Sequence, residues 1–380
     1  MKFIDLAVQQ DAIKEELETR LATVLRHGQY IMGPEVAELE NVLSEYVGVR
    51  NCITVSSGTD ALLISLLALG VRPGDEIITT PFTFISTVEV IVLLGAKPVF
   101  VDVEKNTGLM DASLIEERIT ERTKAIIPVS LYGQIPDLDA INGIAKRYNN
   151  IPLIEDAAQS FGATANGFRS CGISTIGCTS FFPSKPFGCY GDGGALFTND
   201  EEIASKAKSI RIHGQSTRYV HDTVGVCGRL DTIQAAVLLA KWARFSWELD
   251  QRQIIARRYE DQFKGDEFDF IDCLQIRPNY SSVFAQYTIV VEDRENLQVS
   301  LRELGIPTVV HYPTIVTDQP GYRDYANDNP TPVASWLSKH VLSLPMGPDL
   351  SASDQLAVVD ALKEIGLSSQ SQNSKLSKAA

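Results

Sequence analysis

One lysine lies in a segment whose composition suits covalent chemistry. Lys185 stands within residues 180–188 (SFFPSKPFG), and further glycines follow at 191, 193 and 194. A lysine that forms a Schiff base needs a loop that lets the backbone and a cofactor approach closely, which glycines permit. The segment alone is equally compatible with a surface lysine in a glycine-rich loop.

A carboxylate follows an apolar run that predicts a buried strand near residues 151–154. Asp156 should therefore emerge at the carboxyl end of a central strand, where open α/β sheets bind their ligands. An ionised carboxylate beside a pyridine nitrogen keeps that nitrogen protonated and makes the ring an electron sink. Two alternatives remain: Glu155 is the inward residue, or the acid only caps a following helix.

Small polar residues at positions 56–60 (SSGTD) precede an apolar helical segment. Gly58 and Thr59 would offer backbone N–H groups at a helix N-terminus, which is a site for a phosphate. Simple helix capping produces the same pattern. Phe84 follows the next strand and could cover one face of an aromatic cofactor, although an isolated phenylalanine is more often part of a core.

These residues need a sheet whose strands end at one edge, and the sequence predicts one. Apolar runs alternate with helical periods from about residue 50 to 200, which is typical of parallel strands joined by crossover helices. We expect an α/β fold with a large domain over residues 1–245 that contains a mostly parallel sheet. A smaller C-terminal α+β domain should cover 246–366, and a polar tail at 367–380 should be disordered. A helix is expected at 112–119 and a long one from about 230 to 264.

Composition excludes several classes of protein. The net charge is -14 without any cluster of lysines and arginines, which argues against nucleic-acid binding. No segment approaches the ~18 apolar residues of a membrane span, so we expect a soluble, cytoplasmic protein. Six cysteines and five histidines form no metal-binding motif, and no metal is expected. Neither a dinucleotide-binding nor a P-loop motif is present.

Taken together, these motifs resemble the DegT/DnrJ/EryC1/StrS family of sugar aminotransferases. The resemblance rests on 57–62 (SGTDAL), 155–160 (EDAAQS), Ser180 with Lys185, and the glycines that follow. It extends from residues 3–6 (FIDL) to 344–346 (LPM) and includes 26–30 (RHGQY) and 310–313 (VHYP). The similarity implies pyridoxal 5'-phosphate (PLP) as the cofactor, the fold-type I architecture of PLP-dependent transferases, and a homodimer with shared active sites.

The resemblance also implies roles for individual residues. Lys185 would form the Schiff base with PLP, and Asp156 would pair with its pyridinium. Gln159 would lie near the ring and its phenolic oxygen, and Phe84 would stack on the ring. Gly58, Thr59 and Ser180 would hold the phosphate.

One subgroup of the family is more similar still, on residues 128–134 (PVSLYGQ), 179–186 (TSFFPSKP) and 225–232 (GVCGRLDT). It comprises UDP-2-acetamido-2-deoxy-3-oxo-glucuronate aminotransferases of bacterial surface-polysaccharide (O-antigen) pathways. The similarity implies a UDP-linked keto-sugar and L-glutamate, released as 2-oxoglutarate, as substrates. Arg229, His311 and Tyr312 would bind the sugar, with Arg229 reaching its carboxylate from the partner subunit. Cys227 departs from the pattern, because the family usually has Asn there for the phosphate of the neighbouring subunit's PLP.

Other functions remain as alternatives. The aminotransferase could act on another nucleotide-linked keto-sugar. A sugar-nucleotide dehydratase resembles these proteins but has His where Lys185 stands. A non-catalytic regulator that binds a sugar nucleotide would not need Lys185 and Asp156. Arg229 could also be no more than the partner of Asp231 in a surface ion pair.

Overall fold

A seven-stranded sheet forms the centre of the large domain. The computed structural model describes residues 1–326 and 330–379, with side chains described up to residue 367. The strand order is β3-β2-β4 in one group and β5-β8-β9-β1 in the other. Parallel bridges from Ile126 to Leu153 and from Val129 to Asp156 join the two groups. The strands are β1 (Asn51–Val55), β2 (Glu76–Thr79), β3 (Lys97–Phe100), β4 (Thr123–Ile126), β5 (Ile154–Asp156), β8 (Ile176–Ser180) and β9 (Gly194–Thr198).

The direction of the strands confirms the expected sheet. β2 pairs in parallel with β3 and β4, and β5 pairs in parallel with β8. Only β9 runs against its neighbours, since it is antiparallel to both β8 and β1. The parallel strands therefore end at one edge, where the predicted site residues are gathered.

Helices cover this sheet, and the sequence of one of them, α4 (Gly58–Ala68), explains its burial. The others are α5 (Ser86–Leu93), α6 (Leu138–Arg147) and α7 (Glu201–Ile210). From Ala61 to Ala68 every side chain of α4 except Ser65 is apolar, and the helix packs against β8, β9 and α7. The Ser57 side chain accepts a hydrogen bond from the Asp60 N–H and begins this helix.

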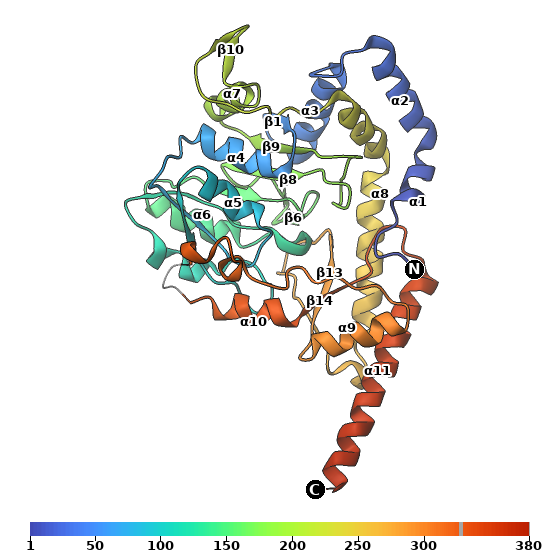
Figure 1. Cartoon of the computed structure of the whole chain (residues 1–380). Coiled ribbons are helices and arrows are strands. Elements are labelled where there is room, and N and C mark those ends of the chain that lie inside the picture. The colour runs from blue at the N-terminus through green and yellow to red at the C-terminus, as the bar shows by residue number, and fades with distance from the viewer. Residues whose placement is uncertain (327–329, 380) are drawn as a thin grey trace.

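The N-terminal helices contact one long helix, α8 (Thr232–Gln262): two of them pack along it, and the first reaches it through a hydrogen bond from Gln9 to Glu248. They are α1 (Leu6–Ala12), α2 (Lys14–His27) and α3 (Pro34–Val47). In Figure 1, α8 runs from the large domain down to the C-terminal elements. The domain boundary expected at 245/246 therefore lies inside one continuous helix, which has helix-forming residues on both sides of that point.

A smaller unit follows α8, as the sequence predicted. Its antiparallel sheet has the order β12 (Asp272–Cys273), β13 (Tyr287–Val290), β14 (Val341–Leu344). Its helices are α9 (Arg294–Glu303), α10 (Pro332–His340) and α11 (Ala352–Ala379). The α11 backbone continues to Ala379, where the sequence predicted a disordered tail, because extending an existing helix costs little per residue. The side chains of 368–379 and all of residue 380 lie outside the described part of the chain.

Short elements complete the fold, and those at 112–119 differ from what the sequence predicted. Residues 112–119 form two short 3₁₀ turns instead of the expected helix, and only Ile115 among them is fully buried. The 3₁₀ turns are η1 (Ala112–Leu114), η2 (Glu116–Arg118), η3 (Leu131–Gly133), η4 (Asp266–Phe268), η5 (Val316–Asp318) and η6 (Arg323–Tyr325). The remaining strands are β6 (Thr164–Ala165), β7 (Phe168–Arg169), β10 (Gln215–Thr217) and β11 (Val220–His221). In the described part of the chain, no helix combines the length and apolarity needed to cross a bilayer.

Candidate active site

A cavity of about 460 Å³ lies at the carboxyl edge of the central sheet. It is within the usual size range of small-molecule sites. The structure brings together all seven residues that the sequence predicted for the cofactor, and two of the three predicted for the sugar. These lining residues are Gly58, Thr59, Phe84, Asp156, Gln159, Ser180, Lys185, His311 and Tyr312.

Asp156 is the acid of β5 that faces this cavity. Its Oδ2 accepts a hydrogen bond of 2.7 Å from the Thr87 hydroxyl, and its Oδ1 accepts one of 3.2 Å from the Ala158 N–H. Burial raises the pKa of the Asp156 carboxyl, while these hydrogen bonds and the charge of Lys185 lower it. Burial is the largest of these effects and the pKa is raised overall, so the charge of this carboxyl group at the end of a strand depends on its hydrogen-bond donors.

Glu155, the alternative that the sequence left open, is enclosed on the other side of the strand. Its carboxylate accepts hydrogen bonds of 2.7 Å from the Ser130 and Ser170 hydroxyls and of 2.8 Å from the Cys171 N–H. The side chain is fully buried and does not line the cavity. Glu155 therefore joins β5 to its neighbouring segments, and of the two acids Asp156 alone lines the cavity.

Lys185 lies on the loop that follows β8, opposite Asp156. The side chain is partly buried and lines the cavity, so the alternative of a surface lysine is wrong. Burial lowers the pKa of the Lys185 amine, and the negative charge of Asp156 raises it. A lowered pKa leaves more of the amine neutral near pH 7, which is the form that attacks a carbonyl or accepts a proton.

A lysine of α8 supports the loop that carries Lys185. The buried ammonium of Lys241 donates a 2.6 Å hydrogen bond to the Gly188 carbonyl and lies 4.3 Å from the centre of the Tyr190 ring. At Gly188 an added Cβ would come within 2.5 Å of the Phe182 carbonyl oxygen. The turn after Lys185 therefore requires glycine, which is how the glycine-rich sequence fixes the loop.

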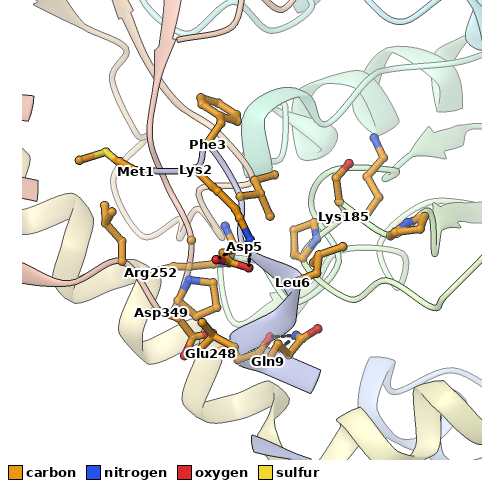
Figure 2. A pocket seen from close by; sticks show the side chains of 18 of the residues that line it. Met1, Lys2, Phe3, Asp5, Leu6, Gln9, Lys185, Glu248, Arg252 and Asp349 are labelled. Atoms are coloured by element: carbon orange, nitrogen blue, oxygen red, sulfur yellow. Dashed lines mark hydrogen bonds and ion pairs between the residues drawn. The ribbon is translucent and has the colours of Figure 1, made fainter. Parts of the chain in front are cut away.

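A second cavity, of about 380 Å³, lies on the other side of this loop (Figure 2). It is enclosed by the N-terminal segment, the C-terminal half of α8 and residues 347–350. Lys185 lines both cavities, and Figure 2 shows its amine pointing away from Asp5 and Glu248. The amine is thus directed to the cavity that contains Asp156.

The start of α4 and the end of β8 form a cradle that fits a phosphate. The first N–H groups of a helix have no partner within it, and Gly58 and Thr59 supply them here. A Cβ at Gly58 would lie 2.7 Å from the Cβ of Ser180, so only glycine allows the two segments this close. The cradle, the Asp156 carboxylate and the Lys185 amine are the donor and acceptor set that PLP requires, so the residues fit this cofactor.

Side chains from both domains form the wall around the cradle. The Gln159 amide accepts a hydrogen bond from the Tyr132 N–H and donates one of 3.1 Å to the Tyr312 hydroxyl. Phe84 is 52% exposed and lies 5.9 Å from the Tyr312 ring, centre to centre, so it is not a core residue. Burial and the nearby charge of Lys185 lower the pKa of His311 to about 4, so its imidazole is neutral near pH 7.

Arg229 is the one predicted site residue that the cavity does not include within this single chain. Its Nη2 donates a 3.0 Å hydrogen bond to the Cys227 thiol, and its Nε has no partner in the described part of the chain. No ion pair joins Arg229 to Asp231 there, so the alternative of a simple surface ion pair is not supported. No carboxylate of the described chain pairs with this guanidinium.

The sequence did not point to Thr83, Thr87 or Lys241. Thr83 lines the cavity, Thr87 donates to Asp156, and Lys241 holds the Lys185 loop. One signal was present, because Thr83 and Thr87 are four residues apart at the start of a helix that follows a strand of the same sheet. Lys241 gave no signal, since a lysine in a long helix is usually exposed.

The fold and the cavity together define a class of protein. A mostly parallel sheet presents a helix N-terminus, a carboxylate and a lysine at one edge, which is the arrangement of a PLP-dependent transferase of fold type I. The family model for "DegT/DnrJ/EryC1/StrS aminotransferase family" matches residues 11–363. The chain belongs to this family of PLP-dependent sugar aminotransferases.

Individual relatives agree with this assignment. The chain is 52% identical over 364 residues to the UDP-2-acetamido-2-deoxy-3-oxo-D-glucuronate aminotransferase of Pseudomonas aeruginosa, covering 95% of this chain and 99% of that protein. It superposes on DesV of S. venezuelae, solved with a ketimine intermediate, with a TM-score of 0.93 at 36% identity, covering 96% and 98% of the two chains. It also superposes on NtdA of Bacillus subtilis, solved with bound cofactor PMP, with a TM-score of 0.86 at 32% identity, covering 93% and 82%.

Proposed function

We propose that this sugar aminotransferase transfers the amino group of L-glutamate to UDP-2-acetamido-2-deoxy-3-oxo-glucuronate. The observation that carries the proposal is the set of Lys185, Asp156 and the Gly58–Thr59 cradle in one cavity. The identity to the P. aeruginosa relative supports the particular sugar. The product would enter the synthesis of a bacterial surface polysaccharide such as O-antigen.

The cofactor would be held at five points. Lys185 would bind it covalently, the cradle with Ser180 would hold its phosphate, and Asp156 would pair with its ring nitrogen. Phe84 would cover one face, and Gln159 would lie near the ring oxygen. When bound, PLP supplies an electron sink that stabilises negative charge on the carbon next to the transferred amine.

Lys185 would then move the proton on which the transfer depends. In the first half-reaction its amine would carry a proton from the α-carbon of glutamate to C4' of the cofactor, and in the second it would carry one from C4' to the sugar C3. A general acid/base needs a pKa near the working pH, and burial lowers that of Lys185 in this direction. Because the two substrates use one site in turn, the kinetics should be ping-pong.

The sugar would be bound by residues of both subunits. His311 and Tyr312 line the cavity, and Arg229 would reach the uronate carboxylate across the interface. The planar guanidinium can bind a carboxylate with two parallel hydrogen bonds. No carboxylate of the described chain pairs with the Arg229 guanidinium, whose Nη2 donates only to the Cys227 thiol, and this supports the role.

A homodimer would complete the site. Exposed apolar side chains gather near Arg229, which supports an interface there: Tyr30, Ile31 and Met32 are each 40% or more exposed. Ile31 bridges to Asp231, and the Tyr30 carbonyl accepts from the Thr232 N–H, so this segment lies at the start of α8. We propose that the protein is a homodimer and that it is cytoplasmic. Sedimentation of the purified protein tests the homodimer directly.

The decisive experiment offers the purified holoenzyme a panel of UDP- and dTDP-linked keto-sugars with L-glutamate. Release of 2-oxoglutarate and formation of the amino sugar should be fastest with the UDP-linked 3-oxo-glucuronate. A faster reaction with a sugar that lacks the carboxylate would assign the enzyme to another nucleotide-linked keto-sugar. Dehydration without amine transfer would indicate the dehydratase, which Lys185 disfavours.

A further inference from the structure

Two buried threonines form a chain of hydrogen bonds that begins at Asp156 and leads away from β5. The Thr87 hydroxyl donates to Asp156 Oδ2 at 2.7 Å, and the Thr83 and Thr87 hydroxyls are 2.9 Å apart. Thr87 is fully buried in the first turn of α5, and Thr83 is 4% exposed just before that helix. Neither hydroxyl is needed to build the helix, because Ile85 is its N-cap residue and no side chain caps it.

The direction of this chain of hydroxyls follows from proton counting. A hydroxyl has one hydrogen, and Thr87 gives its hydrogen to the carboxylate of Asp156. Thr83 must therefore donate to Thr87, and Thr87 accepts. The order Thr83 to Thr87 to Asp156 holds while Asp156 is ionised, and each donation strengthens the next.

Asp156 depends on this support more than its neighbour Glu155 does. In the described part of the chain, the Asp156 carboxylate has one side-chain donor, Thr87, and one backbone donor, at Ala158. Glu155 has three donors, two of them hydroxyls. A buried carboxylate with few donors takes up a proton, and a protonated Asp156 would no longer pair with a positively charged ring nitrogen.

We propose that Thr83 and Thr87 form a hydroxyl relay that keeps Asp156 charged and oriented toward the cofactor ring, and that both are positioning residues for catalysis. The inference rests on the role proposed above for Asp156. The other titratable groups that act on or near Asp156 are Lys185 of the facing loop, Tyr312 of the C-terminal unit, Glu155 of β5 and Cys178 of β8. None of them donates a hydrogen bond to the Asp156 carboxylate in the described structure.

The test removes each hydroxyl and keeps the shape of the side chain. Thr87→Val should slow the glutamate half-reaction on the order of 10- to 100-fold, the range for a hydrogen bond to a charged group, and change KM less than about twofold. The acid limb of its pH profile should move to higher pH. Thr83→Val should cause a smaller shift in the same direction. Thr87→Ser restores the donor and should return the rate to within about threefold of wild type.

A matched control distinguishes the relay from the loss of any buried hydroxyl. Thr79 of β2 is fully buried and donates a 2.9 Å hydrogen bond to the Ile127 carbonyl, without contact to Asp156. Thr79→Val should lower the melting temperature but leave the pH profile unchanged. Cofactor absorbance against pH and PLP affinity of the apoenzyme, measured for every variant, provide readouts that do not need turnover.

Some outcomes would overturn the relay. It is refuted if Thr87→Val changes only the melting temperature, or if it shifts the profile no more than Thr79→Val does. If Thr87→Val does not fold, Thr87→Ala, which puts no methyl group in place of the hydroxyl, and Thr83→Val decide the same question. A wild-type protein that binds PLP but does not react with glutamate would refute the proposed donor, while the absorbance titration would still decide the relay.

Discussion

Glu155 and Asp156 are consecutive residues of β5 whose carboxylates lie on opposite sides of the strand. Asp156 lines the catalytic cavity and accepts from Thr87, whereas Glu155 is enclosed by Ser130, Ser170 and the Cys171 N–H. Successive side chains of a strand point to opposite faces, so one acid serves the site and the other the fold.

Exchanging each of these acids for its amide should separate the two roles. Asp156→Asn should still bind PLP but lose activity on the order of 100-fold, because a neutral amide cannot hold the ring nitrogen protonated. Glu155→Gln should lower the free energy of unfolding by about 2 kcal/mol, since its amide NH₂ faces donors. Kinetics and denaturant unfolding of both variants check this. An inactive, fully stable Glu155→Gln enzyme would reverse the assignment.

Lys185→Ala should abolish turnover and leave the fold intact. The change removes the only amine of the cavity wall in the described chain, and a partly buried loop lysine with a lowered pKa contributes little to stability. Loss of product formation together with an unchanged melting curve of the apoenzyme is the expected result. Full activity in this variant would end the proposed function.

Cys227→Ala should leave PLP affinity close to that of wild type. The thiol is exposed and is a weak donor beside the backbone N–H groups of Gly58 and Thr59 and the hydroxyl of Ser180. Equilibrium titration of the apoenzyme with PLP measures the effect. A loss above about tenfold, or ~1.4 kcal/mol, would show that this position contributes to the neighbouring phosphate site.

Arg229→Lys should raise the KM for the keto-glucuronate and leave the glutamate half-reaction almost unchanged. Lysine keeps the charge but loses the planar pair of donors that binds a carboxylate. The two half-reactions are followed separately by cofactor absorbance. Equal losses in both, or no loss in either, would remove Arg229 as the receptor of the uronate carboxylate.

The stability of the apoenzyme should fall with acid partly because of His311. Its folded pKa is lowered from 6.5 to about 4, first by burial and then by Lys185. Between these pH values the unfolded chain binds more protons than the folded one, so the free energy of unfolding decreases as the pH falls through this window. Unfolding curves of wild type and His311→Asn should converge toward the lower pH. A constant difference between them would contradict the lowered pKa.

Local sequence determined much of this molecule. The alternation of apolar runs and helical periods specified a mostly parallel sheet, because buried parallel strands and their crossover helices leave that periodicity. The glycine-rich run after Lys185 and the small residues at 56–60 indicated the lysine loop and the phosphate cradle. In both places a close backbone approach excludes a Cβ, as at Gly58 and Gly188.

Tertiary structure decided what depends on direction and on contacts between distant segments. The sequence favoured Asp156 but left Glu155 open, because the choice depends on which face of β5 meets α5 and which meets the segment near Ser170. In the Thr83–Thr87–Asp156 chain, Thr87 and Asp156 are 69 positions apart, and Lys241 reaches Gly188 across 53 positions. Burial also decided that residues 112–119 form short turns and that α8 continues through residue 245. A local sequence pattern does not show which residues will be buried.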